Sequence, residues 1–358
     1  MSSFSPPGDR ATLEAMSTTV VTLGEIMLRL KSPGFERLLQ RPELEATFGG
    51  GEANVAVSLA GYGLETRFVS ALPANPLGDA CIAELRRRGV DTTHIRRQGE
   101  RLGVYFLEAG ANQRPSKVIY DRSHSAIAEA GPEDIDLDRA FEGADWFHIS
   151  GITPAISESA AEISIAAVRR AAERGLTVSC DLNYRKKLWN YGKSPAEVMG
   201  EIIPHVDVAI GNEEDFQKSL GVEMPGAVES GELDREAYAE MAAQVLGAHG
   251  KLGKVAVTLR ESRSASHNGW SAMLAGRQDT RFSRHYEITD IVDRVGAGDA
   301  FAAGLIYGLS ALPGDAEALE FATAASCLKH SIPGDFALLS VGEVLALAGG
   351  DASGRVQR

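Results

Sequence analysis

Short apolar runs alternate with longer segments of helical periodicity along most of the chain. Runs at residues 20–24, 66–72, 145–150, 176–183, 206–212 and 254–259 are apolar with little alternation, which is typical of strands buried on both faces. The spacers between them are long enough for crossover helices, predicted over residues 52–62, 76–88, 157–174, 234–248 and 300–309. The pattern therefore predicts an α/β fold, a doubly wound and mostly parallel sheet flanked by helices.

Two stretches depart from this rhythm. Residues 26–48 and 102–122 contain alternating apolar and polar positions joined by turns, which favours strands of a small separate sheet. We interpret these two insertions as a β-sheet lid over the main domain, which we place at residues 19–348. Residues 1–18 and 349–358 are expected to be loose tails.

Composition narrows the class of partner. The 358 residues carry a net charge of -13 and a pI of about 5.2, which argues against binding nucleic acid or an anionic membrane. The three cysteines are far apart, which argues against a disulfide framework. No apolar targeting or spanning segment is recognisable, so a cytoplasmic protein is expected.

The segment DRVGAGDAFAAG, residues 293–304, combines a glycine turn with the start of a helix of small residues. Free amide groups at a helix N-terminus favour an anion such as phosphate. Gly296, Ala297 and Gly298 would form this anion site, and Asp299 follows them directly. A packed helix after an ordinary glycine turn, without any bound anion, would have the same sequence pattern.

A second segment, GGGEANVA at residues 49–56, ends a strand of the lid and begins a helix. Gly50 allows a polar ligand to approach the backbone, and the Asn54 amide both donates and accepts hydrogen bonds. Alone, the segment could equally be a tight turn with a cap. The spacing does not match a dinucleotide fingerprint or a P-loop, so an NAD-dependent enzyme is not favoured.

The two segments together, in this order and separation, resemble the two signatures of the ribokinase-like carbohydrate kinases, also called the PfkB family. The resemblance covers residues 20–347. Within the family, GEIMLRL, YDRSHSAIAEA, DLNYRKKLW and LKHSIPGDF resemble the 2-keto-3-deoxygluconate kinases, which phosphorylate a sugar acid. A substrate carboxylate needs a fixed cation in a protein this acidic, and an arginine guanidinium can donate two parallel hydrogen bonds to a carboxylate.

The resemblance implies a role for each matching position. Asp299 would be the general base and Arg185 would bind the substrate carboxylate or the phosphoryl group, although Arg185 could instead be a surface residue. Tyr105, Tyr120 and Arg122 would contact the sugar acid from the lid or be ordinary strand residues. The implied substrate contacts are Gly50, Asn54, Tyr105, Tyr120, Arg122, Arg185 and Asp299, and the implied nucleotide contacts are Asn212, Thr258, Arg260, Glu261 and Gly298.

The acidic segment GNEED, residues 211–215, suggests Glu214 as a ligand of Mg²⁺ through water, or else simply as a helix-capping acid. Arg294 departs from the threonine that relatives usually carry. Implied cofactors are ATP and Mg²⁺, with a monovalent cation as an option of the family. We also expect a homo-oligomer formed through the lid.

The expected reaction is ATP-dependent phosphorylation of 2-keto-3-deoxy-D-gluconate to its 6-phosphate. Three alternatives stay open at this stage. The substrate could be the galactonate epimer, or a neutral sugar as in a fructokinase or ribokinase. The chain could also be a sugar-binding regulator without turnover, although the intact Asp299 and glycines count against that.

Overall fold

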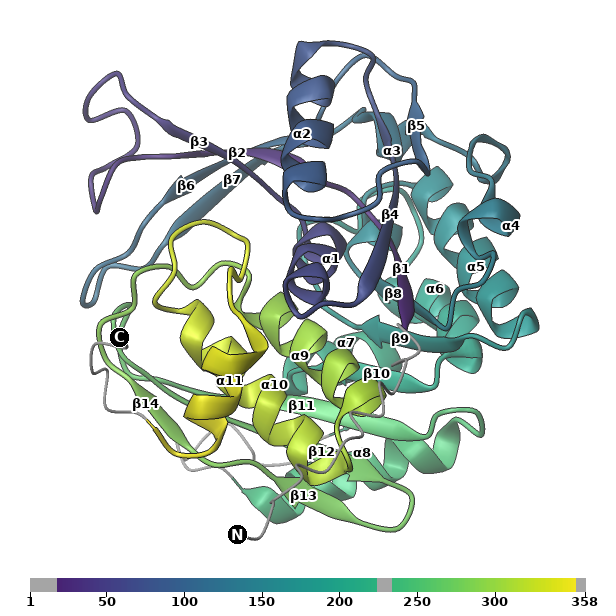
Figure 1. Cartoon of the computed structure of the whole chain (residues 1–358), viewed down its shortest axis with the longest axis vertical. Coiled ribbons are helices and arrows are strands. Elements are labelled where there is room, and N and C mark those ends of the chain that lie inside the picture. The colour runs from purple at the N-terminus through teal and green to yellow at the C-terminus, as the bar shows by residue number, and fades with distance from the viewer. Residues whose placement is uncertain (1–17, 224–233, 352–358) are drawn as a thin grey trace, which may run out of the picture.

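A ten-stranded sheet lies at the centre of the protein, whose computed structural model describes residues 18–223 and 234–351 (Figure 1). Its strands are β1 (Thr19–Leu23), β4 (Glu65–Leu72), β5 (Ile95–Arg97), β8 (Trp146–Ser150), β9 (Thr177–Asp181), β10 (Val208–Gly211), β11 (Lys254–Ser262), β12 (Asn268–Gly276), β13 (Thr280–Phe282) and β14 (Tyr286–Ile288). The order is β13-β12-β11-β10-β9-β8-β1-β4-β5, with β14 also on β12. All neighbours from β11 to β5 are parallel, whereas β12 pairs antiparallel with β11, β13 and β14.

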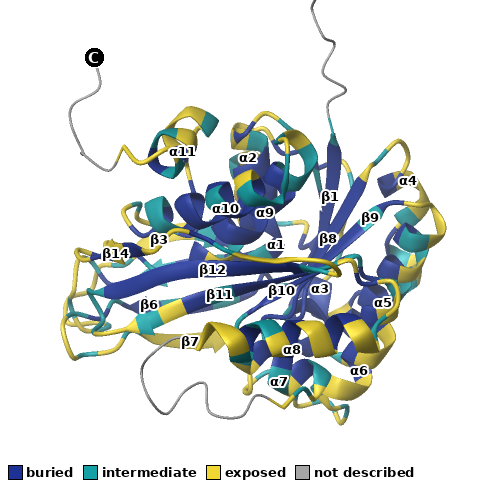
Figure 2. Cartoon of the chain, turned by 90° about the horizontal axis from the view of Figure 1, so that it is seen from below, coloured by how far each residue is buried: buried dark blue, intermediate teal, exposed yellow. Residues whose placement is uncertain are grey.

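Helices cover both faces of this sheet, which confirms the predicted α/β class. One face carries α3 (Ala126–Glu129), α4 (Leu137–Ala140), α5 (Glu158–Glu173), α6 (Pro195–Ile202), α7 (Glu213–Leu220) and α8 (Arg235–Ala248). The other carries α1 (Gly51–Gly61), α2 (Pro76–Arg87), α9 (Ala297–Ala311), α10 (Asp315–Lys329) and α11 (Val341–Ala348). Along β1, Val21 and Leu23 face the first core and Val20 the second, which explains the uninterrupted apolar run. Figure 2 shows the central strands almost wholly buried.

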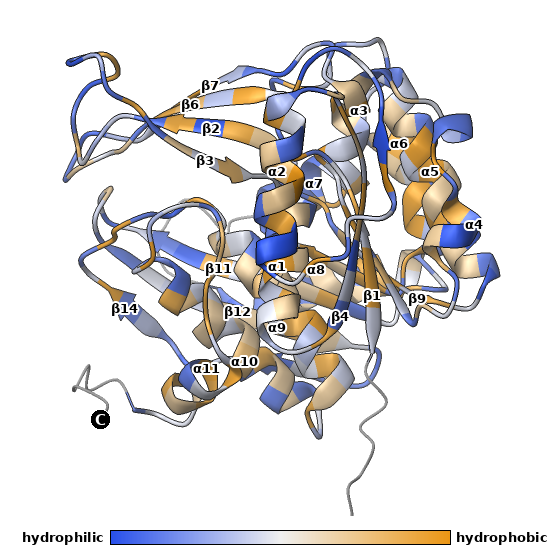
Figure 3. Ribbon diagram, turned by 45° about the horizontal axis from the view of Figure 1, so that its top comes forward, coloured by the Kyte–Doolittle hydropathy of each residue, from blue (hydrophilic) through white to orange (hydrophobic). Residues whose placement is uncertain are grey.

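The two insertions form a separate sheet of four strands that projects from the body (Figure 3). It consists of β2 (Met27–Lys31), β3 (Glu45–Gly49), β6 (Val104–Glu108) and β7 (Lys117–Asp121), in the order β3-β2-β6-β7. Met27, Tyr105 and Leu107 pack together against Val295, which belongs to the loop before α9. The base of the lid therefore touches the segment that leads into the predicted anion site.

The glycines of α9 allow this helix to lie unusually close to α10. A Cβ atom on Gly304 would come within 2.7 Å of Ala322 Cα, and one on Gly308 within 2.5 Å of Ala318 Cα. Both distances are too short for a side chain, so only glycine fits at these two positions. The small residues of the motif thus fix the position of α9 and of the turn at its N-terminus.

Strand β14 ends at Ile288, before the segment at residues 293–304. The chain leaves the sheet because other acceptors take its amides: Ile291 N donates to Ser266 O, and the amides of Val292 and Asp293 donate to His330 O. Helix α9 begins at Ala297, three residues earlier than the pattern indicated. The expected tails lie outside the described residues, apart from Thr18 and residues 349–351.

Within the described residues, every helix is too short or too polar to cross a bilayer.

Candidate active site

A pocket of about 710 Å³ opens between the lid, the carboxyl ends of β9, β10 and β11, and the N-terminus of α9. Parallel α/β sheets bind ligands at this edge because strand ends and helix N-termini meet there. Fourteen of the residues predicted from the sequence line this pocket: Gly50, Asn54, Tyr105, Tyr120, Arg122, Arg185, Asn212, Glu214, Thr258, Arg260, Gly296, Ala297, Gly298 and Asp299. One predicted residue, Glu261, lies elsewhere.

The turn at residues 296–299 has the geometry of an anion site. Gly296 has a φ of 83°, and a Cβ atom there would be 2.1 Å from Asp335 O, so glycine is required on both counts. The first intrahelical bond of α9 runs from Ala300 N to Gly296 O (2.9 Å). The amides of Gly298 and Asp299 precede that bond and are directed toward the helix N-terminus. Ala297 N, expected to belong to the anion site, instead donates to Arg294 O (3.3 Å).

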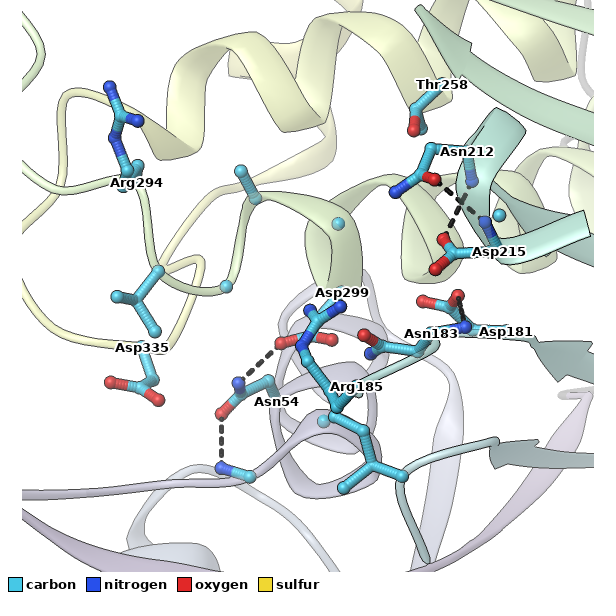
Figure 4. Close-up of a pocket in the computed structure, with 18 of the residues that line it drawn as sticks. Asn54, Asp181, Asn183, Arg185, Asn212, Asp215, Thr258, Arg294, Asp299 and Asp335 are labelled. Atoms are coloured by element: carbon cyan, nitrogen blue, oxygen red, sulfur yellow. Dashed lines mark hydrogen bonds between the residues drawn. The ribbon is translucent and has the colours of Figure 1, made fainter. Parts of the chain in front are cut away.

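Asp299 lies at the base of the pocket in a half-buried position. Its carboxylate accepts a hydrogen bond of 2.6 Å from Asn54 Nδ2, which Figure 4 marks. Burial raises the pKa of Asp299 to about 7, the Asn54 hydrogen bond opposes this rise, and the charges of Asp335 and Glu52 add to it. A carboxylate with a pKa near neutrality is suited to exchange a proton at physiological pH.

Asn54 owes its position to the first turn of α1. Its Oδ1 accepts from Gly50 N (3.2 Å) while its Nδ2 donates to Asp299, so both polar atoms of the side chain are bonded. Its backbone N–H donates to Gly50 O (2.8 Å). A Cβ atom on Gly50 would be 2.0 Å from Glu25 O. Gly50 is therefore needed for close contact with the loop between β1 and β2, in addition to any contact with a ligand.

The three predicted lid residues differ in how free they are. Tyr105 is buried, and its hydroxyl group donates its one proton to the Asp335 carboxylate, whose two oxygens lie 2.6 and 2.7 Å away. Arg122 is also buried, and its Nε donates to Glu25 Oε2 (2.7 Å). Tyr120 is 44% exposed, with the Arg122 guanidinium 5.4 Å from its ring centre. Tyr120 thus has the freest side chain of the three.

Arg185 is exposed at the mouth of the pocket, just past the end of β9. Its Nη1 donates to Tyr184 O (2.9 Å), and Figure 4 shows it beside Asp299. The pKa of the nearby buried Asp181 is raised by burial and by the charges of Asp215 and Asp299, while Arg185 counteracts that rise. Arg185 therefore supplies positive charge close to the carboxylates of Asp181 and Asp299, as expected for a residue that binds an anion.

The opposite side of the pocket is formed by β11 and the start of α7. Thr258 and Arg260 line the pocket, whereas Glu261 lies on the other face of β11, close to His285 (3.3 Å) and Arg263 (3.6 Å). Side chains alternate along a strand, so Glu261 cannot share the face of Thr258 and Arg260. Placing Glu261 at the nucleotide site with them is therefore not supported by the structure.

Asn212 and Glu214 belong to the beginning of α7. Asn212 caps this helix, because its Oδ1 accepts from Asp215 N (3.0 Å) and its own N–H donates to Asp215 Oδ2 (2.8 Å). Glu214 is exposed in the pocket. Asp215 is buried. It also accepts a hydrogen bond from Tyr184 N (2.8 Å), which links the loop after β9 to α7. The acidic segment thus serves as a helix cap and also lines the pocket.

The pocket is rich in negative charge. Eight carboxylate residues line it, against four arginines. In residues 18–223 and 234–351, however, no group of three or more metal-binding side chains is close enough to hold an ion without help. This arrangement suits a divalent cation that keeps several waters and arrives with phosphate groups, as Mg²⁺ does.

Several residues of the site were not singled out from the sequence. Glu52 is buried behind Asp299, where it accepts from the hydroxyl groups of Ser150 (2.8 Å) and Thr153 (2.7 Å). Asp335 and Asp181 line the pocket as well. Glu52, Asp335 and Asp181 lie in the motifs GGGEANVA, LKHSIPGDF and DLNYR, respectively. An acid next to glycine or at a strand end within such a motif could therefore have indicated each of them.

Comparison with known proteins agrees with this geometry. Residues 17–336 match the family model described as pfkB family carbohydrate kinase. The chain belongs to this family. The match confirms the recognised family, the ribokinase-like fold class and the assignment as a carbohydrate kinase.

Three similar proteins match almost the whole chain. The crystal structure of a 2-dehydro-3-deoxygluconokinase from Thermotoga maritima is 50% identical, with a TM-score of 0.88, and the match covers 93% of this chain and 99% of that one. A 2-dehydro-3-deoxygalactonokinase from Haloferax volcanii is 34% identical over 94% of this chain and 99% of its own. A 2-dehydro-3-deoxygluconokinase from Bacillus subtilis is 25% identical over 92% and 95%.

Proposed function

We propose that this carbohydrate kinase transfers the terminal phosphoryl group of ATP to the 6-hydroxyl group of 2-keto-3-deoxy-D-gluconate, also called 2-dehydro-3-deoxy-D-gluconate. The observation that carries the proposal is the pairing of Asp299, whose pKa is raised to about 7, with the amides of the 296–299 turn in one pocket. The relatives named for 2-dehydro-3-deoxy sugar acids support this class of substrate.

In the proposed reaction, the amides of Gly298 and Asp299 stabilise negative charge on the phosphoryl group during transfer. The Asp299 carboxylate accepts the proton of the attacking hydroxyl group, which is a role typically worth about 10²- to 10⁴-fold in rate. Asn54 holds that carboxylate in place by its hydrogen bond of 2.6 Å. Arg185 and the lid residue Tyr120 bind the sugar acid.

ATP would lie along the side of the pocket formed by Asn212, Thr258 and Arg260. The acid-rich lining at Asp181 and Glu214 fits Mg²⁺ bound through its waters, and the ion would neutralise charge on the ATP phosphates. Solved kinases of this fold from Escherichia coli and Pyrococcus horikoshii contain ATP, the former with Mg²⁺. A cytoplasmic location and a homo-oligomer built through the lid stay predictions.

The deciding experiment is an ADP-release assay over a panel of acceptors, namely 2-keto-3-deoxygluconate, its galactonate epimer, fructose, ribose and adenosine. The gluconate compound should give the highest kcat/KM, and Asp299→Asn should reduce kcat by about 10²- to 10⁴-fold with both substrates still bound. Near wild-type kcat in Asp299→Asn would remove this residue from the mechanism.

The galactonate epimer is the second candidate, favoured by the Haloferax volcanii relative at 34% identity. Preference for that epimer would correct the substrate and leave the reaction unchanged. Preference for fructose or ribose would overturn the assignment to a sugar acid.

A further inference from the structure

A second arginine, Arg29 on β2 of the lid, is buried behind the 296–299 turn, with only 1% of its surface exposed. Its Nη1 donates to Asp335 Oδ1 (2.6 Å), and its Nη2 bonds the carboxylate of Asp293. These partners lie 306 and 264 residues away in the sequence. One side chain of the lid therefore binds both segments that flank the turn.

The two carboxylates shape the backbone around the turn. Asp293 Oδ1 accepts from Val295 N (3.1 Å), and its Oδ2 accepts from Gly334 N (3.1 Å). The Tyr105 hydroxyl group on β6 donates its one proton to the Asp335 carboxylate. Removal of Arg29 would leave two buried carboxylates without their strongest partner, which is costly in a low-dielectric interior.

Lys329, the last residue of α10, completes this cluster and is fully buried. Its Nζ donates to Ile332 O (3.0 Å) and to Asp293 O (3.5 Å), so it joins the loop before the turn to the loop after α10. Burial lowers the pKa of Lys329, and the charges of Asp293 and Asp335 oppose that change. Burial raises the pKa of Asp335, and the charge of Arg29 opposes that rise. With both acids ionised and Lys329 in its ammonium form, two cations balance two carboxylates and the cluster is neutral.

We propose that Arg29 is a positioning residue for phosphoryl transfer, which ties the lid to the 296–299 turn and prevents negative charge from accumulating beside Asp299. The proposal rests on the proposed kinase reaction, because it concerns the residue that acts there as base. Arg29 would act through Asp293 and Asp335 and would not itself touch the reacting atoms.

Charge near Asp299 comes from several elements. Asp335 and Glu52 raise its pKa and Arg185 lowers it, while Asp181 and Lys329 also interact with it electrostatically. Without Arg29, Asp293 and Asp335 lose their neutralising partner, so the anionic form of Asp299 becomes less favourable and its pKa rises. Because the base must be ionised, the acid limb of the kcat profile should then move to higher pH.

The test compares pH profiles of kcat for the wild type, Arg29→Met, Arg29→Lys and the double variant Arg29→Met/Asp293→Asn. We expect Arg29→Met to move the acid limb up by about one pH unit. Arg29→Lys, which keeps the charge, should lie near the wild type. In the double variant the cluster is neutral again, so the acid limb of the kcat profile should return toward the wild-type position. This should hold even though the double variant loses more hydrogen bonds than Arg29→Met.

A matched control is Arg170→Met. Arg170 also bonds two carboxylates, Asp138 (2.6 Å) and Glu173 (3.2 Å), but it does so at the surface of α5, so its removal should leave the profile unchanged. If Arg29→Met does not fold, Lys329→Met removes a positive charge from the same cluster and should shift the limb in the same direction.

An unshifted limb in the folded single variants, or a double variant shifted as far as Arg29→Met, would overturn the proposal. Absence of turnover in the wild type with every acceptor would instead overturn the proposed function. The cluster would then be tested by calorimetry of ATP binding between about pH 6 and about pH 9, which needs no turnover. There, Arg29→Met should weaken binding about tenfold and the double variant should recover it, and equal affinities would refute the role of Arg29.

Discussion

Replacing Asn54 by alanine removes the one hydrogen bond that the structure shows between the Asp299 carboxylate and another side chain of the described part, Asn54 Nδ2 to Oδ2 at 2.6 Å. A hydrogen bond to a charged group is worth about 1.5–3 kcal/mol, and about 1.4 kcal/mol corresponds to one pKa unit. The pKa of Asp299 should therefore rise from about 7 to about 8–9.

The consequence for catalysis follows from the fraction of Asp299 that is ionised. At pH 7 this fraction falls from about one half to between about a tenth and about a hundredth, so kcat should fall about 5- to 50-fold. At about pH 10 most of the activity should return. The measurement is ADP release at saturating ATP and sugar acid from about pH 6 to about pH 10.

Asn75→Ala is the control, since Asn75 caps α2 by accepting from the amides of Leu77 and Gly78 (3.1 Å each) and lies outside the pocket lining. It should cost about 1 kcal/mol of stability and leave the pH profile unmoved. If kcat of Asn54→Ala is reduced equally at every pH, the hydrogen bond does not set the pKa of Asp299 and the reasoning is refuted.

Three further predictions concern single residues of the pocket. Asp299→Asn should raise the melting temperature above about pH 7. In the wild type the native Asp299 keeps a proton that the unfolded chain releases from about pH 4, so the wild type loses stability as pH rises from about 4 to about 7. Calorimetry should find that the gain in melting temperature vanishes near pH 4, and a gain independent of pH would contradict the raised pKa of Asp299. Arg185→Ala should reduce kcat/KM for the sugar acid at least tenfold more than for fructose, if fructose is turned over at all, and equal losses would argue against carboxylate recognition. Arg260→Ala should raise the KM for ATP several-fold while Glu261→Ala, on the other face of β11, leaves it unchanged; the reverse result would refute the placement of the nucleotide.

Much of the main sheet could be predicted because buried parallel strands have a strong local pattern. The run at residues 20–24 supplies side chains to two cores, which only an almost continuous apolar segment can do. Strand β12 escaped prediction although eight of its nine residues are buried, since Asn268, Gly269 and Ser271 interrupt the apolar pattern. Its burial depends on pairing with β11, β13 and β14, which no local window contains.

The site could be predicted where glycine or a strand end marks it, as at Gly296, Asp299 and Arg185. Arg29 could not, because a charged residue in an alternating strand gives the same pattern whether it faces solvent or two buried acids. The exclusion of Glu261, in contrast, was available from the sequence. It is one residue from Arg260 and three from Thr258, so the twofold alternation of a strand places it on the opposite face.

The junction between lid and body has a consequence for engineering. The lid enters the chain as two insertions, and Arg29 and Tyr105 within them bond Asp293 and Asp335 in the body. A chimera that exchanges only residues 26–48 and 102–122 for those of a kinase with another acceptor would leave these acids paired with foreign side chains. A graft should therefore exchange Asp293 and Asp335 together with the two insertions, so that Arg29, Tyr105 and the two acids stay matched.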